Sequence, residues 1–200
     1  GINYRYLKEE NGLSNNIVYC LFEDLRGNIW IGTYDGLNLY DGVSIKTFNE
    51  ENGLNSTVIK TIAEDATGRI WVGTENGGIS VLNPKSKNFQ FEEFNIVVDK
   101  YIGNSFRKII ESSDGKMWLA GNKGVTVIDG NKTYHYVQND GLAGNYVFDL
   151  HEDINGDIVI ATNNGLSIFD GKTFTNYSTE NGFPSNDILC IEEDQKGNLW

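Results

Sequence analysis

A four-residue pattern, Gly-x-hydrophobic-Trp, recurs along this chain of 200 residues at an almost constant spacing. Four copies end at Trp30, Trp71, Trp118 and Trp200, and a further copy carries Val159 in place of tryptophan. Successive copies are 41 residues apart, except for one interval of 47 residues. A second marker, Asn-Gly-Leu or a close variant, keeps the same period at residues 11–13, 52–54, 140–142 and 181–183. Two markers with one period near 40 residues indicate the internal repeats of a solenoid or a propeller.

Each repeat predicts four short strands separated by turns, with essentially no helix. In the first repeat we expect strands at residues 17–23, 28–33, 37–40 and 44–48. An Asp-x-x-Gly turn follows the first strand, and an Asp-Gly hairpin dipeptide follows the third. Four-stranded antiparallel meanders at this spacing are typical of β-propeller blades, whereas helix-pair repeats would need a 3.6-residue periodicity. The predicted fold class is all-β: four complete four-stranded propeller blades plus a partial terminal blade.

The repeat boundaries predict one propeller fragment over residues 1–200. The units cover about residues 9–49, 50–94, 95–137 and 138–178, with a truncated unit at 179–200. Residues 3–8 align with the last strand of the fourth unit, and the sequence stops inside a second strand at Trp200. We therefore expect a piece of a larger propeller, and self-association through the open edges of the terminal strands.

Residues that occupy the same position in every repeat favour an architectural role. All four Trp residues are expected in the core, where large rings fill the wedge between blades. A glutamate also recurs at one register, at Glu23, Glu64, Glu111, Glu152 and Glu193. A residue present in every unit serves the blade more readily than it serves as a lone catalytic acid.

Composition and motifs argue against several classes of function. The net charge of −12 is unsuited to nucleic acid, which needs clustered lysine and arginine. There is no run of 18 apolar residues, so we expect no membrane contact by this segment. The two histidines, His135 and His151, lie in different repeats, and no catalytic or metal-binding motif is found. We predict no enzyme, no cofactor and no metal, and two free cysteines, Cys20 and Cys190, at equivalent repeat positions.

The repeats resemble the two-component regulator propeller repeat, most clearly over residues 11–42 and 52–83. The shared elements are Asn-Gly-Leu, then Glu-Asp-x-x-Gly-x-Ile-Trp-Ile-Gly-Thr, then Gly-Leu-x-x-Tyr-Asp-Gly. This repeat is typical of the sensor regions of hybrid two-component histidine kinases in gut Bacteroidetes. There, two propellers and an immunoglobulin-like domain precede the membrane segment, and many members sense breakdown products of glycans. The resemblance implies a periplasmic, ligand-sensing, non-catalytic segment that signals to an intracellular kinase.

The third and fourth repeats depart from the pattern. Ala120 stands where Gly-Thr begins in other units, and the long interval places six extra residues around residues 94–104. Insertions in a strict repeat usually form loops on one face, often the binding face. We expect this loop on the same face as the variable loops described next.

Candidate ligand-binding residues lie where the repeats differ from one another. The loops between the second and third strands vary, and propeller geometry brings them to the same face as the segments that enter the first strands. Their polar side chains suit hydrogen bonds to a polyhydroxylated ligand, and Tyr34 and Tyr146 suit stacking, although turns favour such residues in any case. The predicted loop residues are Tyr34, Asp35, Glu75, Asn76, Asn122, Lys123, Asn163 and Asn164.

Two cations complete the predicted site. Lys60 and Arg107 share one register on the first strands, near the expected channel, and would suit an anionic group such as a uronate or a sulfate. A polar lining of a water-filled channel is the alternative reading of the same residues. The predicted ligand is an oligosaccharide derived from a glycan. The competing function is a protein-interaction or dimerisation propeller without a small-molecule ligand.

Overall fold

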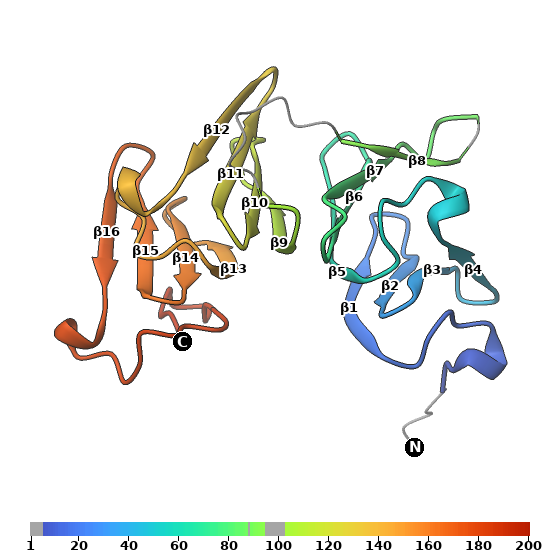
Figure 1. Cartoon of the computed structure of the whole chain (residues 1–200), viewed down its shortest axis with the longest axis horizontal. Helices are drawn as coiled ribbons and strands as arrows, with labels where there is room; N and C mark the ends of the chain where they lie inside the picture. The colour runs from blue at the N-terminus through green and yellow to red at the C-terminus, as the bar shows by residue number, and fades with distance from the viewer. Residues whose placement is uncertain (1–5, 88, 95–102) are drawn as a thin grey trace. The chain divides into compact units, whose positions relative to one another are not determined.

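The computed structural model describes residues 6–87, 89–94 and 103–200, and its strands form four antiparallel meanders (Figure 1). Blade 1 contains β1 (Val18–Glu23), β2 (Ile29–Thr33), β3 (Gly36–Tyr40) and β4 (Ile45–Phe48). Blade 2 contains β5 (Ile59–Glu64), β6 (Ile70–Thr74), β7 (Ile79–Leu82) and β8 (Phe91–Glu93). Blade 3 contains β9 (Phe106–Glu111), β10 (Met117–Gly121), β11 (Gly124–Asp129) and β12 (Lys132–Tyr136). Blade 4 contains β13 (Val147–Glu152), β14 (Ile158–Thr162), β15 (Gly165–Phe169) and β16 (Phe174–Tyr177).

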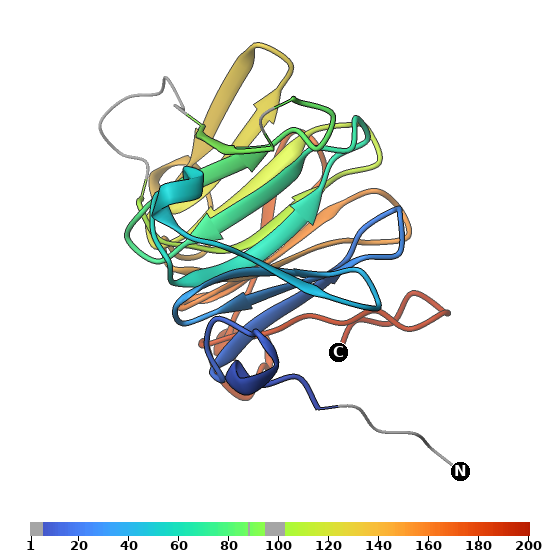
Figure 2. The same cartoon turned by 90° about the vertical axis from the view of Figure 1, so that its right-hand side faces the viewer.

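The predicted all-β propeller architecture is confirmed, and the expected strands of the first repeat begin at most one residue away from β1–β4. The chain divides into two compact units, residues 1–94 with blades 1 and 2, and residues 95–200 with blades 3 and 4. Within unit 1, β1 lies beside β5, and Figure 2 shows the two sheets of this unit stacked on each other. Within unit 2, β9 lies beside β13 in the same way.

Trp30 and Trp118 fill the space between the two neighbouring sheets of their own units. Trp30 packs with Leu54, Ile59 and Phe91 of the following blade, and Trp118 packs with residues of blade 4. Each indole also finds a hydrogen-bond acceptor at the start of its own Asp-x-x-Gly turn. Trp30 Nε1 donates to Asp24 Oδ2 at 3.0 Å, and Trp71 Nε1 donates to Asp65 Oδ2 at 2.7 Å. The turn and the core are therefore joined by one side-chain contact.

Glycine in the second strand allows the blades to approach closely. A Cβ atom at Gly32 would lie 2.4 Å from Cys20 Sγ and 2.7 Å from Ile59 Cγ2 of the next blade. Both cysteines are free, as expected. Burial raises the pKa of the Cys20 thiol to about 12, so this residue is a small apolar side chain at neutral pH.

The repeated glutamates hold one blade to the turn of the blade before it. Glu64 Oε2 accepts a hydrogen bond from the backbone N–H of Leu25 at 2.7 Å. In unit 2, both carboxylate oxygens of Glu152 accept from Ser113, at 2.7 Å from its N–H and 2.6 Å from its hydroxyl. The expected architectural role of this register is visible in both units.

The Asn-Gly-Leu marker forms a single 3-10 turn, a feature that the sequence did not predict. These turns are η1 (Glu9–Asn11), η2 (Glu50–Asn52), η3 (Gln138–Asp140) and η4 (Thr179–Asn181). Each ends at a glycine in the left-handed region, such as Gly53 at a φ of 88°. The leucine that follows is buried, as at Leu54 and Leu142. The marker is therefore a chain reversal anchored by one apolar side chain.

The ends of the chain differ in part from expectation. Trp200 is not a core residue, because 78% of its surface is exposed, and only a hairpin contact with Glu192 and a 3.4 Å bond to Asp194 Oδ2 hold it. The expected strand at residues 3–8 lies partly outside the described residues, and Tyr6–Lys8 are not in a strand. Residues 95–102 of the lengthened loop also lie outside the described part.

Candidate functional site: the loop face of the blades

In blades 1, 2 and 4, the loops between the second and third strands are shaped by a threonine at the end of the second strand, whereas β10 of blade 3 ends in Gly121. In blade 1, Thr33 Oγ1 donates to Gly36 O at 2.8 Å and accepts from the N–H of Asp35 at 3.2 Å. In blade 4, Thr162 makes the same two bonds to Gly165 O and Asn164 N, at 2.7 and 3.1 Å. In both blades the buried threonine fixes the backbone of the loop, and the two residues at the loop tip are exposed.

These loops share one face with the segments that enter the first strands. The N–H of Tyr34 donates to Ile17 O at 2.9 Å, and the N–H of Glu75 donates to Val58 O at 2.9 Å. Blades 3 and 4 repeat the contact with the donors Asn122 and Asn163. The expected common face for both loop sets is therefore present in each unit, and we call it the loop face.

In unit 1, two predicted residues are exposed and two form an ion pair. Tyr34 is 52% exposed, and Asp35 lies exposed beside it. Lys60 Nζ lies 2.9 Å from Glu75 Oε2 and 3.5 Å from the centre of the Tyr19 ring. The ammonium group of Lys60 is thus held between a carboxylate and an aromatic face, so it is not an unoccupied anion site.

Asn76 occupies a strained backbone position beside this ion pair. Its φ of 64° lies in the left-handed region, which asparagine adopts more readily than most residues. Asn76 is exposed at the tip of the loop.

In unit 2, Arg107 is also engaged with aromatic side chains. One guanidinium nitrogen donates to the Tyr146 hydroxyl at 2.6 Å. The guanidinium carbon lies 4.9 Å from the Tyr146 ring centre and 5.7 Å from that of Phe148. Arg107 is nevertheless exposed, and stacking holds its planar group in a defined orientation at the surface. Lys60 and Arg107 lie in separate units.

The cation–aromatic pairs follow the repeat register, a signal that sequence analysis did not use. Tyr19 and Phe148 occupy the same repeat position as Lys60 and Arg107. In each unit, one blade supplies the cation and its neighbour supplies the ring at this position. Aligning the first strands by residue type would have revealed the pairing.

The remaining predicted loop residues lie around the edge of blades 3 and 4. Lys123, Asn163 and Asn164 are exposed, and Asn122 is partly buried. The Asn122 side-chain oxygen is buried without a hydrogen-bond partner among the described residues. Asn164 lines a polar cavity of about 420 Å³, together with Gln138, Asn176 and Asn186. Its amide group donates to Ala143 O at 2.9 Å, so one of its polar atoms is already paired.

The histidines serve as partners of neighbouring side chains. His151 Nε2 lies 2.9 Å from Glu193 Oε2, and His135 Nδ1 lies 3.0 Å from Thr126 Oγ1. Among the described residues, no group of three or more His, Cys, Asp or Glu side chains is arranged to hold a metal ion. In that same part of the chain, no helix is both long and apolar enough to cross a membrane.

Comparison with protein families gives one match, which covers three segments of the chain. Residues 12–35, 53–76 and 182–200 match the family model described as two component regulator propeller. Each matched segment begins at the glycine of the Asn-Gly-Leu marker or its variant and includes the Gly-x-hydrophobic-Trp pattern of its repeat. A search of curated protein sequences gives no match.

Solved structures show the same fold. The extracellular domain assigned to the hybrid two component system BT3049 from B. thetaiotaomicron aligns over 91% of this chain and 26% of its own, with a TM-score of 0.81 and 27% identity. That of BT4673 from the same organism aligns over 99% of this chain and 30% of its own, with a TM-score of 0.83 and 22% identity. The chain therefore spans less than a third of the length of these relatives.

An enzyme is also among the structures with this fold. Virginiamycin B lyase from Staphylococcus aureus aligns over 92% of this chain and 62% of its own, with a TM-score of 0.68 and 14% identity. At this identity the likeness shows the fold alone.

Proposed function

We propose that this chain, which carries repeats of the two component regulator propeller family, is part of the extracytoplasmic sensor region of a hybrid two-component histidine kinase. One observation carries the proposal: the chain matches the family in three repeats and aligns over 91% of its length with an extracellular domain of such a system at 27% identity. On this proposal the segment is periplasmic and signals to a kinase that lies outside it.

We further propose that the segment binds its ligand without catalysis. The fold does not decide this point, because virginiamycin B lyase shares it. The proposal rests first on the sensor character of the family. It rests second on the repeated carboxylates, which accept hydrogen bonds from backbone N–H groups and from an indole of the blades. A conserved acid that is committed to the architecture of its blade is not available as a general base.

The proposed ligand is an oligosaccharide derived from a glycan, bound at the loop face. Exposed asparagine, aspartate, lysine and tyrosine side chains on these loops offer donors and acceptors for sugar hydroxyl groups. In unit 2, Arg107 presents a stacked guanidinium and Asn164 lines a polar cavity of about 420 Å³. Within each unit the loop tips of the two blades differ in their side chains, and such variation is what recognition of an asymmetric ligand requires.

Calorimetric titration with neutral and acidic oligosaccharides tests this proposal. Maltotriose and cellotriose serve as neutral probes, and digalacturonate serves as the acidic probe. Saturable heat is expected with at least one sugar of a broader panel of this kind, and it should weaken in the triple variant Tyr34→Ala, Glu75→Ala, Lys123→Ala. A matched variant on the opposite face, Arg26→Ala with Lys196→Ala, should bind as the parent does. If the loop-face triple variant still binds and the Arg26→Ala, Lys196→Ala variant does not, the ligand lies on the opposite face and the proposal is wrong.

The competing proposal is a propeller that binds protein, including a second copy of itself. Exposed apolar side chains on β1 and near the C-terminus favour it, since Leu21 is 67% exposed and Leu189 is 66% exposed. Sedimentation velocity over a hundredfold concentration range separates the two. A concentration-dependent dimer that disperses when Leu21 and Leu189 are changed to Ser supports association, and a monomer at all concentrations contradicts it.

A further inference from the structure

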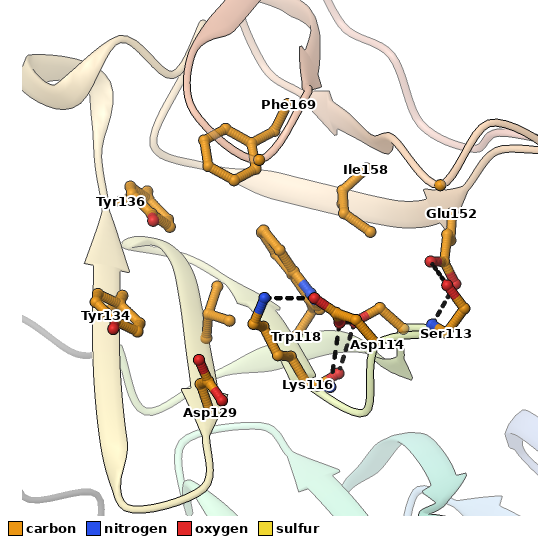
Figure 3. A pocket seen from close by; sticks show the side chains of 14 residues that line it. Ser113, Asp114, Lys116, Trp118, Asp129, Tyr134, Tyr136, Glu152, Ile158 and Phe169 are labelled. Carbon is orange, nitrogen blue, oxygen red and sulfur yellow. Dashed lines mark hydrogen bonds and ion pairs between the residues drawn. The ribbon is translucent and has the colours of Figure 1, made fainter.

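A concave site on the opposite face of unit 2 is lined by residues that the loop-face proposal does not use (Figure 3). Its volume is about 370 Å³, and it opens between blades 3 and 4 beside the turns that follow β9 and β11. Trp118, Tyr136 and Phe169 form its apolar wall, with Tyr134 at the edge. We call it the turn-face pocket.

Unit 1 shows what fills the equivalent place. The Phe48 and Phe91 rings are 5.5 Å apart at 82°, and their counterparts Tyr136 and Phe174 are 5.4 Å apart at 73°. In unit 1, however, a further ring covers Phe48, because Phe89 lies 5.9 Å from it, centre to centre. The Lys46 ammonium lies 4.3 Å from the Phe89 ring centre and closes that side.

Unit 2 has no residue equivalent to Phe89, since its connection is shorter. Between β7 and β8 the chain has residues 83–90, but between β15 and β16 it has only residues 170–173. The counterparts of the two side chains that contact Phe89 are Tyr136 and Tyr134, and both line the open pocket. Unit 2 therefore lacks a ring at the position of Phe89, while Phe169, which stands where unit 1 has Leu82, lies 5.3 Å from Tyr136, centre to centre, as part of the pocket wall.

The polar groups of the pocket differ from those of the filled site in unit 1. Phe48 is replaced by Tyr136 and Lys46 by Tyr134, which adds two phenolic hydroxyl groups. Burial raises the pKa of Tyr136, so its hydroxyl stays protonated and can donate. In the described chain, neither hydroxyl has a hydrogen-bond partner inside the protein.

The carboxylate of Asp129 is a free hydrogen-bond acceptor among the described residues, whereas the equivalent aspartates in blades 1 and 4 accept hydrogen bonds within their own hairpins. Asp41 accepts from Val43 N and Ser44 N at 2.8 and 2.7 Å, and Asp170 accepts from Lys172 N and Thr173 N at the same two distances. Asp129 pairs through its backbone with Lys132 in a tighter hairpin, and its carboxylate receives no hydrogen bond from the described residues. The acceptor therefore remains available at the mouth of the pocket.

The charges around the pocket limit the ligand class. Asp114 and Lys116 pair with each other, whereas Ser113 donates hydrogen bonds to Glu152 without neutralising it, so Glu152 and Asp129 leave the pocket with a negative excess. Burial alone would raise the pKa of Asp114, but hydrogen bonds from Lys116 and Ser112 outweigh it and hold that pKa below its ordinary value. An anionic sugar would meet repulsion here, and a purely aromatic ring would leave Asp129 and two tyrosine hydroxyls without partners.

We propose that the turn-face pocket binds a neutral pyranose sugar residue, with one apolar face of the ring against the aromatic wall. Its hydroxyl groups donate to Asp129 and exchange hydrogen bonds with Tyr134 and Tyr136. Binding here is independent of the loop face, and it gives this chain a second sugar site on the opposite ends of the strands of unit 2.

The indole N–H signals of a ¹⁵N-labelled chain test the proposal. The probes are the methyl glycosides of glucose, galactose and mannose, with N-acetylphenylalaninamide as the aromatic comparison. At least one glycoside should shift the Trp118 indole signal saturably while the Trp30 and Trp71 signals stay in place. Shifts with none of the sugars, or with the aromatic amide alone, overturn the proposal.

Two variants and one control assign the contacts. Asp129→Asn keeps the shape of the side chain, and Tyr134→Ala removes an exposed ring, and each should weaken sugar binding about tenfold. Asn163→Ala on the loop face should leave the Trp118 response unchanged. Parent-like affinity in Asp129→Asn and Tyr134→Ala overturns the assignment. A chain whose oligosaccharide heat is unchanged by the loop-face triple variant, but which shows the Trp118 response, loses the loop-face proposal and keeps this one.

Discussion

The hydrogen bond between the turn carboxylate of Asp65 and the indole of Trp71 allows us to predict how much stability the variant Asp65→Ala loses. This side chain is 3% exposed, and its two oxygens accept from Thr67, Arg69 and Trp71. Asp65→Ala removes these bonds and leaves the buried indole N–H without a partner. An unsatisfied buried donor costs about 1–3 kcal/mol, and the lost bonds to a charged acceptor add to it. We expect a loss of about 3–4 kcal/mol in the free energy of unfolding of unit 1.

Blade 4 supplies the matched control, because Val159 replaces the tryptophan there. Asp153 occupies the same turn position as Asp65 and accepts from Asn155 N at 2.8 Å and Asp157 N at 2.9 Å, but no indole reaches it. Asp153→Ala should therefore cost only about 1 kcal/mol, the value of the turn bonds alone. The difference between the two variants isolates the part that comes from the indole and from Arg69.

A double-mutant cycle with Trp71→Phe separates the indole from Arg69. We expect a coupling energy of about 1–2 kcal/mol between Asp65→Ala and Trp71→Phe. Urea unfolding followed by circular dichroism, with native-state amide exchange on β6 and β14, gives the stability of each unit separately. Equal losses for Asp65→Ala and Asp153→Ala, or a coupling energy below about 0.5 kcal/mol, would refute the reasoning.

Four further predictions follow from the same contacts. Asp24 and Asp65 have folded pKa values below the ordinary 3.8, and Asp194 is lowered to about 2, so their stabilisation is complete above pH 3.8 and should be lost in acid titration as pH falls towards 2. Glu64→Ala should lower the stability of unit 1 by about 1–2 kcal/mol in urea unfolding, because it frees the Leu25 N–H. Gly32→Ala should cost about 1–3 kcal/mol through the contacts with Cys20 and Ile59, and Cys20→Ala should recover part of that loss. At pH 8, a thiol reagent should label the exposed Cys190 quickly and Cys20, whose pKa is raised to about 12, only on unfolding.

The fold was predictable because two repeated markers and the turn residues agree on one period. Asp24, Gly27 and Trp30 restrict the local backbone or the packing, and most repeats carry the same residues, so the strand positions of the first repeat followed within a residue. The contacts that join the markers were not predicted. Spacing shows that Asp24 and Trp30 recur together, but only the structure brings the carboxylate to the indole nitrogen at 3.0 Å.

The candidate site was predictable only in its placement. Repeat variation located the loops, and antiparallel pairing brought them to one face. The state of each side chain depends on its neighbours in space: Lys60 is held by Glu75 and Tyr19, and Arg107 by Tyr146. The sequence indicated no candidate residue on the turn face, yet the structure has a pocket there, beside the short connection at residues 170–173 and the tight hairpin at Asp129. The repeat pattern alone does not reveal how the length of a connection positions the side chains beside it.

Hydrogen–deuterium exchange with and without a bound oligosaccharide tests the central claim most directly. The sugar is the one that gives saturable heat in the calorimetric panel, at a concentration that occupies the chain fully. The account predicts slower amide exchange at the loop tips, residues 34–35, 75–76, 122–123 and 163–164, in the blades that contact the ligand. Unchanged exchange at all four loops in the saturated chain would contradict it.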